Sequence, residues 1–167
     1  MARFTITHEL PCDVDTFWKT FFDRDFNVEL YTRALRFPSF EILSQTETET
    51  QVTRKVSAQP RMELPAALQK LAGAGFRYTE EGTLTRAEGV WRFRTTPSTL
   101  ADKLKIGGEL RVASIGEGKV RRTAEMVVEA KVFGVGGLIE SSSEKQTREA
   151  WDASAVFMRQ YLGRARG

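Results

Sequence analysis

The sequence is poor in the residues on which disulfide frameworks, metal sites and membrane spans depend. It contains one cysteine, Cys12, so neither an internal disulfide nor a cysteine zinc cluster is possible. The one histidine, His8, excludes a site built on two imidazoles. No apolar run reaches the length of a membrane span or of a signal-peptide core. We therefore expect a protein of the reducing cytoplasm that has neither a metal nor another cofactor.

An excess of charge of one sign is also lacking. The 25 Lys and Arg residues outnumber the 22 Asp and Glu residues by three in a chain of 167 residues. Nucleic-acid binding needs basic charge concentrated on one face, whereas only short pairs such as Arg121 and Arg122 cluster here. The length and the absence of repeats or linkers predict one domain over 1–167, as a monomer or a homodimer, without a nucleic-acid partner.

The hydrophobic periodicity predicts an ordered series of strands and helices. A half-buried strand is expected at 3–9, followed by a short helix that Asp13 caps and a second short helix at about 25–35. A short helix at 65–72 would have Pro65 at its first position. The last helix runs from about 136 to 162, and its ~39 Å length must cross a whole sheet face. Six further strands are expected at 40–44, 50–56, 76–84, 89–96, 106–115 and 120–133.

Three stretches of the chain resemble one superfamily. They are Leu10–Trp18, with a proline and an acidic cap before an aromatic pair, Val132–Glu140 at the junction into the last helix, and Met62–Leu68 followed by the Trp91 strand. Over nearly its whole length the chain resembles the START-like, or birch-pollen-allergen-like, helix-grip superfamily (SRPBCC), and within it a bacterial family of unassigned function. The resemblance implies an α+β fold in which a curved antiparallel sheet of about seven strands wraps a long C-terminal helix.

The resemblance also implies a hydrophobic cavity between the sheet and the helix. Members of the superfamily carry lipids, sterols, polyketides or plant hormones, some cyclise or dehydrate polyketides, and others mainly contact proteins. The residues in the inward phase of the sheet and of the last helix would line such a cavity, or would simply form the core. They are Phe40, Ile42, Tyr78, Trp91, Phe93, Arg122, Met126, Val128, Trp151, Ser154, Met158 and Tyr161.

Several polar residues allow a chemical and a structural interpretation. Tyr78, Ser154 and Tyr161 would offer hydrogen bonds to a ligand or to buried backbone, and Arg122 would face an anionic head group at the cavity mouth. His8 has no partner that the sequence can name, which favours a structural histidine.

Other candidate sites have weaker support in the sequence. Cys12 lies at a helix start without a base or a resolving cysteine. The run 134–137 lacks a phosphate-binding pattern and is expected to turn the strand into the last helix. The carboxylates at positions 47, 49, 80 and 81 are expected in turns or at the surface.

The sequence therefore favours a binding protein over an enzyme. A hydrophobic carrier needs no signature motif, whereas an enzyme must assemble groups that stabilise a transition state. We expect a protein that binds a hydrophobic small molecule or lipid between its sheet and its last helix. The alternatives are an enzyme of the polyketide cyclase/dehydratase type that uses Tyr161, Tyr78 or His8, and a protein-interaction module with a collapsed pocket. Transient contact with a membrane is compatible with a carrier.

Overall fold

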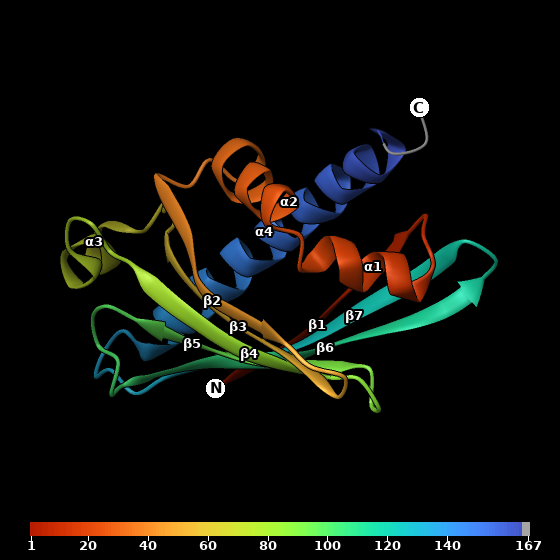
Figure 1. Cartoon of the computed structure of the whole chain (residues 1–167). Coiled ribbons are helices and arrows are strands. Elements are labelled where there is room, and N and C mark those ends of the chain that lie inside the picture. Colours follow the sequence, from red (N-terminus) through yellow and green to blue (C-terminus); the bar gives the residue numbers. More distant parts are fainter. Residues whose placement is uncertain (165–167) are drawn as a thin grey trace.

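One antiparallel sheet dominates the computed structural model, which describes residues 1–164 (Figure 1). The spatial order of its seven strands is β1-β7-β6-β5-β4-β3-β2, and every neighbouring pair is antiparallel. Strands β2 to β7 are therefore neighbours in the order of the sequence, and β1 pairs with β7. The strands are β1 (Ala2–Leu10), β2 (Ser39–Glu47), β3 (Gln51–Gln59), β4 (Tyr78–Thr85), β5 (Val90–Pro97), β6 (Leu104–Gly116) and β7 (Lys119–Ala130).

The helices follow the predicted order, with two local differences. The helix expected over 25–35 is divided into a regular part and a π-helical turn. Pro65 is the residue before the short middle helix, because its extended backbone (ψ 147°) does not continue the helix. The helical segments are α1 (Val14–Phe21), α2 (Arg24–Glu29), η1 (Leu30–Ala34), α3 (Ala66–Ala72) and α4 (Gly136–Arg164).

Aspartate side chains fix the start of the first two helices. Asp13 accepts a hydrogen bond from the backbone N–H of Thr16 at 2.7 Å, as the sequence predicted for the first helix. Asp23 accepts one from the backbone N–H of Phe26 at 2.8 Å and so begins α2. The two short helices therefore follow each other closely, and α2 lies beside the C-terminal half of α4 (Figure 1).

Helix α4 crosses one face of the sheet obliquely (Figure 1). Its 29 residues span ~44 Å at 1.5 Å per residue, and it contacts β1 and β7. The last strand ends at Ala130, three residues earlier than predicted, and the turn into α4 is closed by a bond from the Gly136 N–H to the Val132 carbonyl at 2.9 Å. Within residues 1–164, no helix is long and apolar enough to cross a membrane.

The core lies between the sheet, α4 and the two short helices. Leu10, Phe17, Leu110 and Met158 are completely or almost completely buried there. The predicted α+β helix-grip class, with about seven strands and a long terminal helix, is confirmed.

Two glycines make room on the sheet's inner face for side chains from neighbouring positions. Gly82 and Gly108 lie in one row across the sheet, where each pairs with Phe93 of β5. A Cβ atom on Gly82 would lie 2.2 Å from Cζ2 of Trp91, and one on Gly108 would lie 2.4 Å from the Glu125 carbonyl oxygen. Neither position therefore has room for a larger residue without movement of its neighbours, because the Trp91 ring packs against Gly82 and the Phe93 ring packs against Gly108.

Candidate ligand pocket

A pocket of about 340 Å³ lies between the inner face of the sheet and α4. Strands β3 to β7 supply one wall and α4 the other, while α1, α2, η1 and α3 close the sides. Most of the lining groups are apolar, and aromatic rings are prominent among them: Phe21, Tyr31, Phe37, Phe76, Trp91 and Phe93. This composition suits an apolar ligand.

The structure places eight of the twelve predicted cavity residues around this pocket. Five come from the sheet and three from α4, which is the arrangement that the inward phase of both elements predicts. They are Tyr78, Trp91, Phe93, Arg122, Met126, Trp151, Ser154 and Met158. Their contact with a ligand stays a prediction.

The other four predicted residues do not line the pocket. Phe40 belongs to the outermost part of the sheet and stacks on Tyr31, with 4.1 Å between ring centroids, so that Tyr31 stands between it and the pocket. Ile42 is half-buried on β2, the edge strand, immediately before an irregularity in the pairing with β3. Neither residue lines the pocket, because the pocket does not extend to β2.

Val128 and Tyr161 are part of the packing instead. Val128 is completely buried in the core. Tyr161 lies beyond the pocket on α4, where its hydroxyl donates to Asp23 Oδ2 at 3.2 Å and its ring packs against Phe26 and Phe157. The phase of the helix is as predicted, but the short helix α2 covers this part of it.

Sequence reasoning missed a buried arginine in the pocket wall. Arg54 of β3 is 5% exposed, and its guanidinium lies 4.7 Å from the centroid of Phe21 and 5.2 Å from that of Trp91. It donates to the backbone carbonyl of Phe21 at 3.0 Å. The alternation along β3 indicates that Arg54 points inward, because it shares the phase of the buried Val52 and Val56.

The carboxylate nearest to this arginine is Glu80. Its Oε1 lies 4.0 Å from Arg54 Nη2, and its side chain, 18% exposed, lines the pocket. The expectation that Glu80 occupies a turn or the surface is therefore wrong. Glu80 lies within β4 in the inward phase of Leu84, whereas its neighbour Glu81 points out and pairs with Lys55 at 3.0 Å.

The environment changes the acidity of several groups in the pocket. Burial raises the pKa of the Glu80 carboxyl, and the positive charge of Arg54 opposes this shift. Burial likewise raises the pKa of the Tyr31 and Tyr78 phenols well above the ordinary tyrosine value, and the charge of Glu80 adds to the shift in both. The pocket therefore holds the neutral phenols of two tyrosines beside the pair formed by Arg54 and Glu80.

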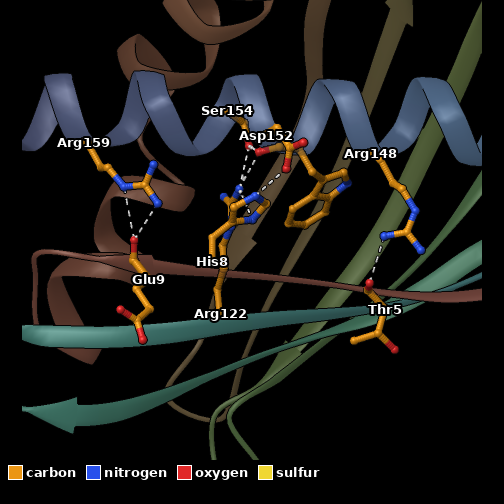
Figure 2. A network of polar contacts seen from close by, with 9 residues as sticks. Thr5, His8, Glu9, Arg122, Arg148, Asp152, Ser154 and Arg159 are labelled. Carbon is orange, nitrogen blue, oxygen red and sulfur yellow. Dashed lines mark hydrogen bonds and ion pairs between the residues drawn. The ribbon is translucent and has the colours of Figure 1, made fainter.

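Arg122 does not lie at an open cavity mouth, where the sequence analysis placed it. It is 3% exposed, and one of its terminal nitrogens donates to the Trp151 carbonyl and to Ser154 Oγ, both at 2.8 Å (Figure 2). Its guanidinium lies 4.8 Å from the centroid of the Trp151 ring. Burial lowers the pKa of Arg122 to about 9, and the charge of Arg159 acts in the same direction. Arg122 therefore sits in the pocket wall and joins β7 to α4, not at an open mouth.

His8 has the partner that the sequence could not name. Its Nε2 lies 2.7 Å from Oδ1 of Asp152 on α4, and its Nδ1 lies 3.3 Å from a terminal nitrogen of Arg122 (Figure 2). Because arginine can only donate, Nδ1 accepts and Nε2–H donates, which is the pattern of a neutral imidazole. Burial lowers the His8 pKa, although the bond to Asp152 opposes this. His8 does not line the pocket.

Two further arginines fasten α4 to β1 on the same side. Arg148 donates to the Thr5 carbonyl at 3.1 Å, and Arg159 donates to the Glu9 carbonyl at 3.0 and 3.2 Å (Figure 2). Together with the His8–Asp152 bond they connect the helix to the first strand at three places. We interpret this network as structural, because its residues lie at the contact between α4 and β1.

The remaining candidates take no part in the pocket. Cys12 is buried in the core. Gly134 has a φ of 80° and makes the predicted turn into α4. Glu47, Glu49 and Glu81 are exposed, as expected. Across residues 1–164 no group of three His, Cys, Asp or Glu side chains could hold a metal ion.

The arrangement of the sheet, α4 and the short helices is the START-like fold, and solved structures share it. A START superfamily protein from Mycobacterium smegmatis is similar with a TM-score of 0.60 at 13% identity, over 95% of this chain and 98% of that one. The Zhui aromatase/cyclase from Streptomyces sp. R1128 is similar with a TM-score of 0.60 at 15% identity, over 96% and 95%. The protein TTHA0849 from Thermus thermophilus gives a TM-score of 0.66 at 15% identity, over 99% and 100%.

The chain belongs to the family described as Protein of unknown function (DUF2505), whose model matches residues 5–162. No curated protein matches the sequence. At identities of 13–15%, the solved structures establish the shared fold alone. The predicted resemblance to the START-like superfamily is thereby confirmed at the level of the fold.

Proposed function

We propose that this protein binds a hydrophobic small molecule or lipid in the pocket between its sheet and α4. The observation that carries the proposal is the pocket of about 340 Å³ with its largely apolar, aromatic-rich lining. The fold supports it, because structural neighbours include a START superfamily protein and an aromatase/cyclase. The cytoplasm is the proposed location and a monomer or a homodimer the proposed state, both on the grounds of composition.

The energy available from such a pocket is enough for binding without a dedicated motif. Burying about ten methylene groups at ~0.8 kcal/mol each gives ~8 kcal/mol of favourable free energy before ordering costs are subtracted. A dissociation constant of 1 μM corresponds to about 8 kcal/mol. An apolar ligand of this size is therefore expected to bind in the micromolar range or more weakly, and polar contacts would add to its affinity.

A blocked pocket provides the test. Ala150 of α4 lines the pocket, whereas Val156 on the same helix is 52% exposed and does not. Ala150→Trp should abolish the fluorescence increase of N-phenyl-1-naphthylamine on titration with the protein, and the matched control Val156→Trp should leave it unchanged. Equal binding by both variants, or no binding by the wild type, contradicts the proposal. The second result, with no co-purifying ligand in native mass spectrometry, would favour an interaction module with a collapsed pocket.

A second candidate function is an enzyme of the cyclase/dehydratase type. Tyr78 and Glu80 favour it, because an acid and a phenol face an apolar pocket from neighbouring positions of one strand. Tyr161 and His8, the other residues considered for this role, lie outside the pocket. Conversion of a poly-β-ketone that Tyr78→Phe abolishes and His8→Gln preserves would support this function, and failure to convert any such substrate would remove it.

A further inference from the structure

Four polar residues form one cluster in the largely apolar pocket wall. Arg54 comes from β3, Glu80 and Tyr78 from β4, and Tyr31 from η1, and all four line the pocket. Arg54 and Glu80 are 4.0 Å apart, and both charges act on the phenols of Tyr31 and Tyr78. We refer to these four residues as the polar cluster.

The polar cluster has hydrogen-bonding capacity to spare. Arg54 uses Nη1 for the Phe21 carbonyl at 3.0 Å and, at 3.5 Å, for Asn27 Oδ1, while its Nη2 faces Glu80. Within residues 1–164, neither phenol nor the Glu80 carboxyl has a hydrogen-bond partner. Polar groups away from bulk solvent are normally paired. The phenols and Nη2 are therefore available as donors, and the carboxyl is available chiefly as an acceptor.

The charges of the cluster restrict the ligand group that it would accept. A carboxylate would bring a second anion beside Glu80, and an ammonium would bring a second cation beside Arg54. A carbonyl oxygen only accepts, and it would leave the Glu80 carboxylate without a donor. A hydroxyl both donates and accepts. It can therefore pair with Glu80 and with a phenol at the same time.

We propose that the polar cluster binds the hydroxyl group of a hydrophobic alcohol or phenol, which donates to Glu80 and accepts from Tyr78, Tyr31 or Arg54. This inference rests on the proposed binding function and names its ligand class. The rings of Phe21, Trp91 and Phe93 beside the cluster provide an apolar wall for the body of the ligand. An aromatic alcohol fits both features.

Three probes of one shape separate the possible ligand groups. Equilibrium dialysis at pH 7 would compare 2-naphthol, naphthalene and 2-naphthoate, which share the same ring system. One or two hydrogen bonds to such groups correspond to about a tenfold gain in affinity. We expect 2-naphthol to bind about tenfold more tightly than either of the other two probes, although naphthalene is the more hydrophobic compound.

Variants in the cluster assign that preference to named atoms. Glu80→Gln and Tyr78→Phe should each lower the affinity for 2-naphthol by about five- to tenfold and change that for naphthalene by less than twofold. Glu81→Gln is the matched control, because Glu81 is the next residue of the strand and points to solvent. Tyr78→Phe removes a single oxygen atom, so the test remains valid if Glu80→Gln folds poorly.

The outcomes distinguish this inference from the proposed function. Equal affinity for naphthalene and 2-naphthol would overturn the hydroxyl site and leave hydrophobic binding intact. Tightest binding of 2-naphthoate would overturn it in favour of an anion site. No binding of any probe to the wild-type protein would overturn both proposals.

Discussion

Substitution of Gly82 by alanine probes the packing that shapes the pocket. The Cβ of the new residue would lie 2.2, 2.5 and 2.6 Å from three atoms of the Trp91 ring system. Trp91 is 1% exposed, and the ring centroids of Phe21 and Phe22 lie 5.6 and 5.4 Å from its own. The indole is rigid and enclosed, so it must move as a unit or force the strands apart.

Overpacking of this kind costs about 1–3 kcal/mol. For a chain of this length, each kcal/mol lowers the midpoint of thermal unfolding by about 2–4 °C, so Gly82→Ala should lower it by about 2–12 °C. Because Trp91 lines the pocket, the displaced ring should also weaken the binding of N-phenyl-1-naphthylamine.

Urea denaturation and thermal unfolding followed by circular dichroism would measure the effect of the Gly82→Ala substitution. Gly137→Ala is the control, because no heavy atom lies within 4 Å of a Cβ at that position, apart from its chain neighbours and the surrounding backbone of α4, and alanine favours a helix. We expect the control to be neutral or stabilising by less than about 1 kcal/mol. An unfolding free energy of Gly82→Ala within about 0.5 kcal/mol of the wild type would refute the claim that the Trp91 ring occupies this space.

Two further predictions concern the contacts of α4. Burial lowers the pKa of His8 in the folded state, and the charges of Arg122 and Arg159 act in the same direction, whereas the bond to Asp152 opposes the shift. The contribution of His8 to stability is therefore complete above the unfolded value of 6.5 and is lost as the pH falls through the folded value. Urea denaturation at a series of pH values should show this loss in the wild type, and His8→Gln should reduce it; an identical pH dependence in both would contradict the assignment. Tyr161→Phe removes the bond to Asp23 and should lower the free energy of unfolding by at most about 1 kcal/mol. The affinity for N-phenyl-1-naphthylamine, measured by fluorescence titration, should stay unchanged. A clear loss of affinity would show that Tyr161 belongs to the pocket.

Local patterns in the sequence determined most of the secondary structure. The alternation at 3–9, the acidic cap at Asp13 and the helical spacing of the inward residues in the last helix depend on neighbouring residues, and the structure agrees with all three. The same alternation indicated the inner face of the sheet, which is why eight of the twelve predicted residues surround the pocket. A period of two or of 3.6 residues is a property of the chain itself.

Only the tertiary structure decided which inward residues meet a hollow and which meet another side chain. Phe40 is covered by Tyr31, and Tyr161 is covered by α2, although both have the predicted phase. Arg54 and Glu80 are joined by strand pairing, and His8 and Asp152 by a contact across 144 positions of the chain. Such contacts depend on how the sheet curves beneath α4. The spacing of residues along one strand or helix does not determine that curvature.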